Sequence, residues 1–167
     1  MNHATHATPL GPFTIVADDD GLVHASGFTA DMDALAVPAT RRRRDLGEAS
    51  RAVRAYFAGD LAAIDDVAVH QTSGPLVERG WAVLRTIQPG APITYTELAA
   101  RCGRPDAPRA ASAACGRNAA ALFVPCHRVL RSSGALGGYR WGLDVKRRLL
   151  AHEAPEVGVM PGSARSL

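Results

Sequence analysis

The spacing of apolar residues changes near the middle of the chain, and this change restricts the folds that the sequence can adopt. Apolar and polar residues alternate over residues 11–28 around Asp18-Asp19-Asp20-Gly21, which is typical of a β-hairpin. Residues 29–45 mix proline, aspartate and arginine and favour a loop. A helical spacing follows at Leu46, Ala49, Val53, Tyr56 and Phe57 and stops at Gly59, and Val67 and Val69 indicate a short strand. Residues 1–71 therefore predict a small α+β unit.

Helical signals dominate the second half of the chain. Gly74-Pro75 opens a helix whose apolar face comprises Val77, Trp81 and Leu84, and Gln88-Pro89-Gly90 is expected to end it. Thr94-Tyr95-Thr96-Glu97 has the capping-box pattern, so a helix is expected from Tyr95 to Gly103. Another is expected from residues 106–108 to Gly116. This pair is consistent with a helix-turn-helix, although other helical hairpins share the pattern.

The rest of the chain predicts one extended segment, one turn and one helix. The chain is expected to run extended from Asn118 through Val124, and Ser132-Ser133-Gly134 favours a turn. A final helix holds Val145, Leu149, Leu150 and Glu153, and the tail from Pro155 onward is expected to fray. The predicted fold class is therefore α+β. A small N-terminal α+β domain (1–71) precedes a mainly helical C-terminal domain with a helix-turn-helix (72–167).

Composition argues against several classes of protein. The three cysteines are odd in number and lack C-x-x-C spacing, which disfavours a disulfide framework and a cysteine zinc site and fits a reduced, cytoplasmic protein. No apolar run approaches the ~20 residues that span a membrane, and the first ten residues lack a secretion signal. The net charge is +3, and arginine supplies nearly all of the positive charge because Lys146 is the only lysine, which is compatible with nucleic-acid binding. The Arg41–Arg44 run is expected to be a solvated loop rather than a DNA contact.

The strongest chemical signal is the segment Val124-Pro125-Cys126-His127-Arg128-Val129. A cysteine reacts as its thiolate, so it needs a base or a positive field nearby, and the adjacent histidine is a candidate base. For an isolated Cys-His pair, a buried structural cysteine is the commoner interpretation. Here the whole hexapeptide resembles the active-site motif of the O6-alkylguanine-DNA alkyltransferase (methylated-DNA–protein-cysteine methyltransferase) family.

Other positions support this resemblance, which covers residues 72–153 well and residues 9–71 more loosely. Asn118 and Arg109 stand eight and seventeen residues before Cys126, as in the family. The remaining matches are Tyr95, Ser132-Ser133-Gly134, Gly138-Tyr139, Lys146, Leu149-Leu150, Glu153, and in the N-terminal part Gly11-Pro12-Phe13-Thr14 and Ala55-Tyr56-Phe57-Ala58-Gly59.

The resemblance implies direct DNA repair that needs no cofactor and no metal. In the family, an alkyl group moves irreversibly from O6 of guanine in duplex DNA to the protein's own cysteine, here Cys126, after minor-groove binding and base flipping. The expected adduct is mainly methyl, and O4 of thymine is a second expected substrate atom. The protein is expected to be a monomer, and cooperative binding on DNA is left open. DNA affinity should be modest, salt-dependent and largely independent of sequence.

The resemblance also assigns catalytic roles. His127 acts as a base through a water, and Glu153 holds and charges its imidazole, as in other nucleophile–base–acid triads. Taken alone, these residues would be interpreted as a hydrogen-bonded structural histidine and a solvated helix-end carboxylate.

Three further residues are implied to assist the transfer. Tyr95 donates a proton toward guanine N3 and crowds the DNA backbone, Lys146 stabilises the developing charge, and Asn118 fixes the loop before the cysteine. Packing at a helix N-terminus is the alternative for Tyr95, and an exposed helix lysine is the alternative for Lys146.

The expected DNA contacts lie on the helix-turn-helix and the turn after the cysteine. Arg109 matches the family's arginine finger, which enters the base stack, and an ordinary phosphate contact is its alternative. The small residues Ala107 and Ala110 suit a helix pressed into a groove, and amides from Thr94 to Thr96 could hold a phosphate. Ser132 is a further expected contact.

The expected base pocket comprises Tyr139, Arg140, Trp141, Leu136 and Val129. The bulky Trp141 is expected to narrow this pocket, so methyl adducts should react better than benzyl adducts.

Two departures from the family pattern are visible. The segment from Ser73 to Trp81 differs from the usual Gly-Thr-x-Phe-Gln-x-x-Val-Trp pattern, of which only Trp81 is kept, and this leaves the interdomain packing there open. No cysteine precedes Cys102, so the N-terminal zinc site of some relatives is not expected.

Three other functions fit the residues less well. A damage-binding relative would lack the cysteine, and a transcriptional regulator would need a further domain with metal-binding cysteines. A papain-like hydrolase would need an oxyanion hole and a distant histidine.

Overall fold

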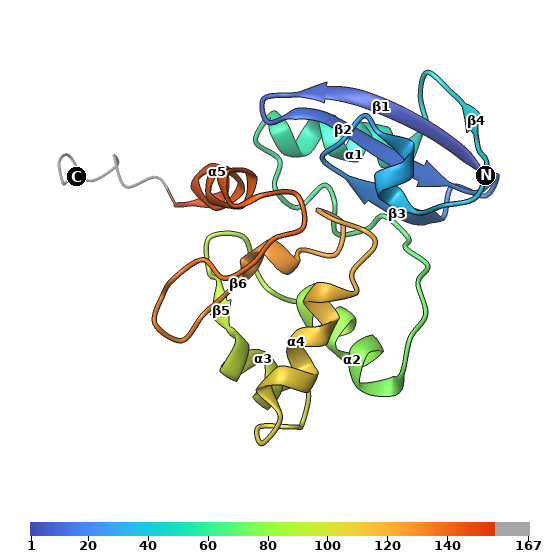
Figure 1. Cartoon of the computed structure of the whole chain (residues 1–167). Coiled ribbons are helices and arrows are strands. Elements are labelled where there is room, and N and C mark those ends of the chain that lie inside the picture. The colour runs from blue at the N-terminus through green and yellow to red at the C-terminus, as the bar shows by residue number, and fades with distance from the viewer. Residues whose placement is uncertain (156–167) are drawn as a thin grey trace, which may run out of the picture.

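The structure is a computed structural model of the chain, and it describes residues 1–155. Its N-terminal part holds a four-stranded sheet in the order β3-β2-β1-β4 (Figure 1). The strands are β1 (Asn2–Thr8), β2 (Gly11–Ala17), β3 (Val23–Gly27) and β4 (Arg41–Arg42). β2 pairs antiparallel with β1 and β3, whereas β4 runs parallel to β1. The tail that was expected to fray lies beyond the described residues, except for Pro155.

The predicted hairpin is confirmed as β2–β3, and its turn is held by one aspartate. Asp18 Oδ1 accepts hydrogen bonds from the backbone N–H groups of Asp20 and Leu22, both at 3.0 Å, and Gly21 takes the left-handed conformation at φ 85°. Strand β1 was not predicted. Its side chains are mostly histidine and threonine, and only the small Asn2 and Ala4 are buried, so its alternation carries little hydrophobic signal.

The predicted helix after the sheet is confirmed as α1 (Glu48–Phe57), which buries Val53 and Tyr56 in the core. The loop prediction for residues 29–45 is partly wrong, because it contains β4 and a short 3-10 helix, η1 (Met32–Leu35), capped by the Asp31 side chain. The strand predicted at Val67 and Val69 is reduced to a single bridge between Val69 and Val23.

The helix-turn-helix prediction is confirmed by α3 (Tyr95–Arg101) and α4 (Pro108–Gly116), which lie beside α2 (Pro75–Leu84) in the lower part of Figure 1. The predicted capping box is present between Thr94 and Glu97. Helix α2 ends at Leu84, earlier than expected, because the N–H groups of Thr86 and Ile87 bond three residues back.

The segment from Asn118 to Val124 is not extended as predicted. It forms a tight turn in which the Val124 N–H bonds to Ala120 O at 2.9 Å and Leu122 adopts a φ of 74°. The chain then enters the 3-10 helix η2 (Cys126–Arg128) and β6 (Val129–Leu130), which pairs in parallel with β5 (Ile93–Thr94). The predicted final helix is α5 (Leu143–Glu153).

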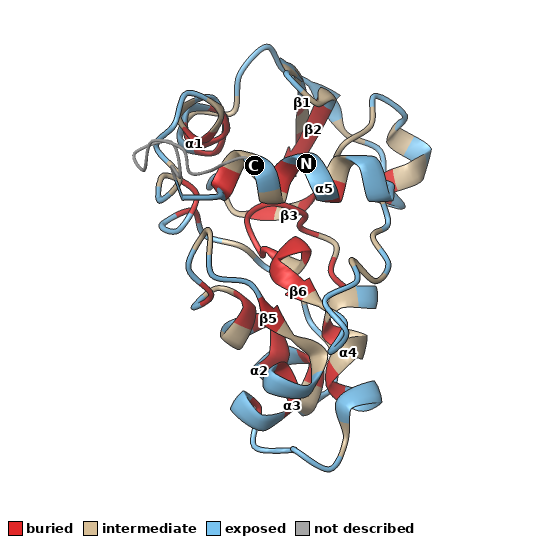
Figure 2. Cartoon of the chain, turned by 90° about the vertical axis from the view of Figure 1, so that its left-hand side faces the viewer, coloured by how far each residue is buried: buried red, intermediate tan, exposed pale blue. Residues whose placement is uncertain are grey.

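The two parts of the chain share one hydrophobic core, and Figure 2 shows buried residues continuing from the sheet through β3 toward β6. The rings of Phe13 on β2 and Phe123 in the turn lie 6.3 Å apart. The backbone carbonyl of Ser26 on β3 accepts a hydrogen bond from the Ala121 N–H, and the Ser26 hydroxyl donates one to Ala121 O at 2.8 Å. The sheet therefore holds the segment that leads to Cys126.

The segment that departs from the family pattern still packs closely against α4. A Cβ on Gly80 would lie only 2.5 Å from the Ala114 Cβ, so a glycine lets α2 approach α4. Trp81 Nε1 donates to Ala114 O at 2.8 Å across the same interface. None of the helices in residues 1–155 has the length and apolar character needed to cross a membrane.

Candidate active site

Cys126 begins η2, and the side chain of Asn118 braces the turn that places it there. Asn118 Nδ2 donates to Val124 O at 2.7 Å, and its Oδ1 accepts from the Ala120 N–H and from Gln71 Nε2, both at 3.0 Å. The Cys126 side chain is half-buried. The arrangement holds the thiol against a cavity on the side of α4.

A buried network surrounds Glu153 at the end of α5. Its Oε2 accepts from Tyr56 Oη at 2.6 Å, from His127 Nε2 at 2.8 Å and from an Arg128 terminal nitrogen at 2.9 Å. Its Oε1 accepts from Arg128 Nε at 2.9 Å. All four side chains are at most 2% exposed, and both oxygens of the paired carboxylate accept hydrogen bonds from protein groups.

The network sets the protonation of the histidine. Burial alone would raise the pKa of Glu153, but hydrogen bonds and charges from His127 and Arg128 lower it to about 2. The ionised carboxylate can only accept, so His127 Nε2 carries its proton and Nδ1 is a free acceptor. Burial lowers the pKa of His127, although Glu153 opposes that shift. The imidazole is therefore neutral near pH 7 and can accept a proton at Nδ1.

The Cys126 thiol is neutral in this resting arrangement. Burial raises its pKa, and a hydrogen bond from Asn118 and the charge of Lys146 oppose that rise. The thiol therefore needs a proton acceptor before it can act as a nucleophile. His127 Nδ1 has no hydrogen-bond partner among residues 1–155 and is the available proton acceptor.

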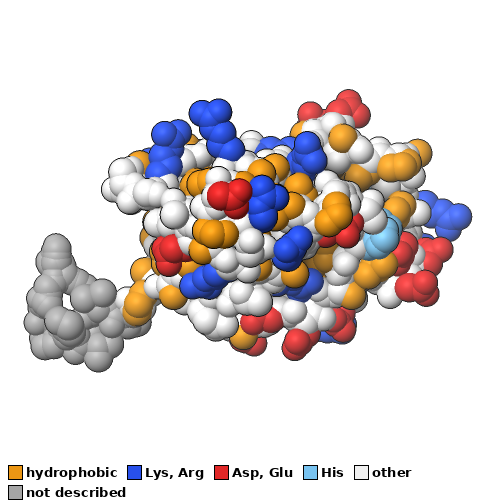
Figure 3. Space-filling model, turned by 90° about the horizontal axis from the view of Figure 1, so that it is seen from below, with side chains coloured by type: hydrophobic (Ala, Val, Ile, Leu, Met, Phe, Trp, Pro, Cys, Tyr) orange, Lys and Arg blue, Asp and Glu red, His pale blue; other side chains and the backbone are white. Residues whose placement is uncertain are grey.

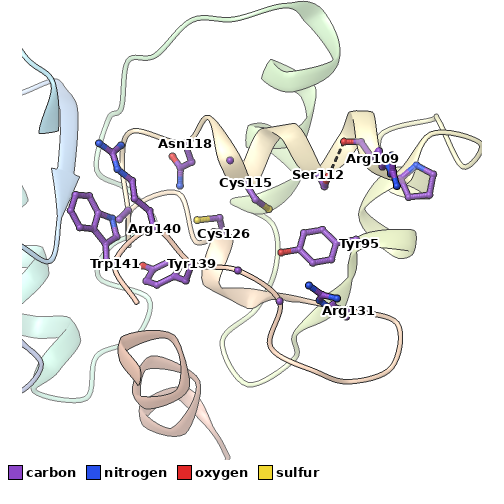
Figure 4. Close-up of a pocket in the computed structure, with 15 residues that line it drawn as sticks. Tyr95, Arg109, Ser112, Cys115, Asn118, Cys126, Arg131, Tyr139, Arg140 and Trp141 are labelled. Carbon is purple, nitrogen blue, oxygen red and sulfur yellow. Dashed lines mark hydrogen bonds between the residues drawn. The ribbon is translucent and has the colours of Figure 1, made fainter. Parts of the chain in front are cut away.

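The cavity beside Cys126 has a volume of about 770 Å³ and opens between α4 and the segment that precedes α5. Figure 4 shows the Cys126 side chain between Asn118, Tyr139 and Tyr95. The residues that line it are Tyr95, Pro108, Arg109, Ser112, Cys115, Gly116, Asn118, Ala121, Cys126, Arg131, Gly137, Gly138, Tyr139, Arg140 and Trp141. Six expected site residues thus line one cavity with Cys126: Tyr95, Arg109, Asn118, Tyr139, Arg140 and Trp141.

Tyr95 is the first residue of α3, and its ring lies in the cavity with the hydroxyl toward Cys126 (Figure 4). Burial raises the pKa of Tyr95 to about 12, so the phenol keeps its proton and can donate it. Gly137 at φ 72° passes so close that a Cβ there would lie 3.1 Å from Tyr95 Oη. The glycine lets the segment before α5 close over the tyrosine.

Lys146 is buried, so the exposed helix lysine considered from the sequence is wrong. Its Nζ donates to Val129 O at 2.8 Å, to Gly138 O at 3.2 Å and to Leu136 O. The backbone carbonyls of Leu136 and Val129 therefore accept hydrogen bonds from Lys146. Contrary to expectation, neither residue lines the cavity. Val129 is fully buried in the core because β6 pairs with β5.

Trp141 has a second environment that the sequence did not indicate. It lines the cavity and also packs on the cluster of Val16, Ala25 and Leu35 in the N-terminal part. A Cβ on Gly27 would lie 2.1 Å from Trp141 Cζ2. The neighbouring Arg140 guanidinium lies 4.8 Å from the Trp141 ring centroid and donates to Ala34 O, so the N-terminal part anchors this segment.

The expected DNA contacts lie around the exposed end of the helix-turn-helix. Arg109 and Ala110 are exposed in the first turn of α4, and Ala107 is half-buried before it. Thr96 and Ser132 are both exposed, and their hydroxyls lie 3.0 Å apart. Figure 3 shows this end of the molecule, where arginine side chains lie among hydrophobic ones and most acidic side chains lie toward the edges.

One expected phosphate contact needs correction. The Thr94 N–H donates to Glu97 Oε1 at 3.0 Å within the capping box, so it is not free to bind phosphate.

Tyr56, Arg128 and Cys115 also belong to the site, although the sequence did not predict a role for them. Arg128 follows His127 directly and Tyr56 lies in the Ala-Tyr-Phe segment, but neither adjacency nor spacing reveals that both meet Glu153. Cys115 lines the same cavity as Cys126. Within residues 1–155, no group of three or more histidine, cysteine, aspartate or glutamate side chains is placed to hold a metal ion.

Comparisons with known proteins agree across the whole described chain. Residues 1–70 match the family model "6-O-methylguanine DNA methyltransferase, ribonuclease-like domain", and residues 75–155 match "6-O-methylguanine DNA methyltransferase, DNA binding domain". The chain is 37% identical over 155 residues to the methylated-DNA–protein-cysteine methyltransferase of Methanosarcina acetivorans, covering 92% of this chain and 98% of that protein. The Salmonella typhimurium protein of the same name is 36% identical, with 88% and 92% covered.

A solved structure supports the same relationship. The Mycobacterium tuberculosis OGT in complex with DNA superimposes with a TM-score of 0.80 at 32% identity, over 93% of this chain and 96% of that one. Two family models, relatives aligned over nearly their full length and this structural match lead to one conclusion. The chain belongs to the methylated-DNA–protein-cysteine methyltransferase family.

Proposed function

We propose that this protein repairs DNA by moving an alkyl group, mainly methyl, from O6 of guanine to its own Cys126. The observation that carries this proposal is the position of Cys126. The thiol lies at a cavity beside the helix-turn-helix, next to a neutral histidine whose Nε2 is held by Glu153 at 2.8 Å. A nucleophile, a base and an orienting carboxylate are the groups that covalent transfer requires. The family membership supports the same function.

The transfer is a displacement at the alkyl carbon. His127 takes the thiol proton at Nδ1 through a water, and Cys126 Sγ forms a bond to carbon as the bond from carbon to O6 breaks. The electron pair stays on the guanine, and Tyr95 donates a proton toward N3. The thioether is stable, so each molecule reacts once. Lys146 contributes through its charge and through the carbonyls that it holds, one of which belongs to Gly138 in the lining of the cavity.

The helix-turn-helix binds the DNA and brings it to the cavity beside Cys126. Arg109, exposed at the start of α4 and lining the cavity, enters the space left by the flipped nucleotide. Ala107 and Ala110 allow close approach to the groove, while Thr96 and Ser132 contact the backbone. Tyr139, Arg140 and Trp141 enclose the base, and the size of Trp141 favours methyl over benzyl adducts.

Four finer points belong to the proposal. O4 of methylated thymine is a second substrate atom, because the same displacement applies to it. The protein acts as a monomer in the cytoplasm, where its three free cysteines remain reduced. The boundary between its two domains falls near residue 71, in the segment between α1 and α2. No cofactor or metal takes part, since Cys126 is itself the acceptor.

The test is mass spectrometry of the intact protein and its peptides after mixing with duplex DNA that carries one O6-methylguanine. We expect one methyl group on the Cys126 peptide at stoichiometric yield and none in Cys126→Ala. Cys115→Ala is the matched control, because it removes a second thiol from the same cavity, and it should still gain the methyl group. DNA binding without methyl gain would instead indicate a damage-binding protein and would remove the roles given to His127 and Glu153.

A further inference from the structure

We propose that Tyr56, on α1 in the N-terminal part, is a positioning residue for the transfer and acts through Glu153. The inference rests on the proposed function, because Glu153 matters to catalysis only if His127 is the base. Tyr56 lies 97 positions from Glu153 in sequence, and its Oη donates to Glu153 Oε2 at 2.6 Å. Both groups are buried, so water does not compete for this hydrogen bond.

The carboxylate oxygen that Tyr56 binds is the one that holds His127. Oε2 therefore carries three donors, from Tyr56, His127 and Arg128, whereas Oε1 carries only Arg128 Nε. Hydrogen bonds to an ionised group are short and strong, and several together prevent the carboxylate from rotating. Tyr56 thus fixes the oxygen that orients the His127 imidazole, and it shares the charge of Oε2 with the imidazole and with Arg128.

Tyr56 makes a second contact, with His152, and this contact allows the electrostatic effect of Tyr56 on Glu153 to be separated from its packing against α5. Tyr56 O accepts from His152 Nε2 at 2.9 Å, and the two rings lie 5.0 Å apart. Two successive residues of α5 therefore dock on Tyr56, but only Glu153 belongs to the network around His127. Removal of the His152 contact loosens the docking of α5 and leaves the carboxylate contacts in place.

The charged and titratable groups around this network come from four elements. They are Tyr56 on α1, His127 and Arg128 on η2, Tyr139 in the segment before α5, and Lys146 and His152 on α5. Asp65, after α1, faces Arg128. Loss of the tyrosine hydroxyl leaves these charges in place but removes a donor from the ionised carboxylate. That change raises the pKa of Glu153, and it also raises the pKa of His127, because Oε2 then binds the imidazolium more strongly.

The experiment compares Tyr56→Phe with His152→Ala in the full-length protein. We expect Tyr56→Phe to slow single-turnover methyl transfer about tenfold, in line with the loss of a hydrogen bond to a charged group, with unchanged DNA affinity. The acid limb of its pH–rate profile should move to higher pH, because both pKa changes have that sign. His152→Ala should leave the profile in place. In a Glu153→Gln background, Tyr56→Phe should add no further loss, because its effect passes through that carboxylate.

A second readout does not depend on DNA repair. The rate at which iodoacetamide alkylates Cys126, followed on its peptide across pH, should show the same shift in Tyr56→Phe and none in His152→Ala. Equal losses in both variants, with matching falls in melting temperature and no pH displacement in either readout, would overturn the proposal and leave Tyr56 a packing residue. Absence of methyl transfer in the wild-type protein would refute the proposed function, while the iodoacetamide profile would still decide the role of Tyr56.

Discussion

At the scale of single residues, the structure places charged groups in side chains that are almost fully buried. Glu153 and Arg128 form a buried ion pair, and such pairs cost much desolvation energy unless every donor and acceptor is used. Here both carboxylate oxygens and three guanidinium nitrogens are bonded, the last through the contact of Arg128 to Ile87 O at 2.7 Å. The ion pair of Glu153 and Arg128 therefore helps to orient His127 as well as to stabilise the fold.

Glu153→Gln should lower the free energy of unfolding by about 3 kcal/mol at pH 7, because it leaves the Arg128 charge buried without a counter-charge. The pKa of Glu153 is about 2 in the folded protein and near 4.5 in an ordinary carboxyl. Its contribution is therefore fully present above pH 4.5 and is lost as the pH falls toward 2. Urea unfolding of both proteins at several pH values checks this expectation. Curves that stay equally separated down to pH 2 would contradict it.

Arg109→Ala should weaken binding to duplex DNA and slow methyl transfer from it, and should reduce the slope of log affinity against log salt by about one. It should leave the reaction of Cys126 with iodoacetamide unchanged, because Arg109 is exposed and lies outside the Glu153 network. Arg147→Ala, which removes an exposed arginine from α5, serves as the matched control. A slow reaction with iodoacetamide in Arg109→Ala would show that the arginine affects the thiol itself.

At the scale of elements, the segment between β6 and α5 has little regular structure and depends on contacts at both ends. Lys146 holds the carbonyls of Leu136 and Gly138 at one end, and Trp141 packs beside Gly27 of β3 at the other. Tyr139 lies between these anchors and faces the cavity. The shape of the pocket is thus set by two parts of the chain that are far apart in sequence.

Gly27→Ala should destabilise the protein by about 1–3 kcal/mol and slow methyl transfer, because the new Cβ would overlap Trp141 and displace the segment that carries Tyr139. Thermal unfolding and single-turnover kinetics measure the two effects. Gly74→Ala is the matched control, since a Cβ there meets nothing within 4 Å. Trp141→Ala in the Gly27→Ala protein should restore stability in part, and no recovery would place the strain elsewhere.

At the scale of the whole molecule, the sheet and the helices form one core rather than two independent ones. Phe13 and Ile15 from the sheet belong to the same buried cluster as Leu98 of α3 and Leu149 of α5. The hydrogen bonds of Ser26 and Tyr56 cross between the same parts. The N-terminal part therefore acts as a scaffold for the site as well as a folding partner.

A shared core should make unfolding a single cooperative transition. Circular dichroism reports all helices and the sheet, whereas tryptophan fluorescence reports Trp81 in α2 and Trp141 at the contact with the sheet. The two signals should change at the same urea concentration. Separate midpoints would mean that the helical part stays folded without the sheet.

The local elements were largely predictable because their signals lie within a few residues. The Thr94–Glu97 capping box, Pro75 at the start of α2 and the turn at Asp18 each indicate structure through short-range hydrogen bonds or fixed backbone angles. Strand β1 was not predicted, because its pairing with β2, and not a pattern in its own polar residues, makes it a strand. The turn after Asn118 was not predicted, because hydrogen bonds from the Asn118 side chain override the preference of the following apolar residues for an extended conformation.

The sequence alone determined the reactive group, its neighbour and the family, since the motif around Cys126 is contiguous and its partners keep fixed spacing. Only the tertiary structure decided which groups act on them. Tyr56 and Arg128 share the Glu153 carboxylate, Lys146 holds carbonyls from within the core, and Trp141 is anchored by Gly27. These contacts join residues far apart in the chain, and they arise from packing and from the need to satisfy buried polar groups. Neither cause leaves a local pattern in the sequence.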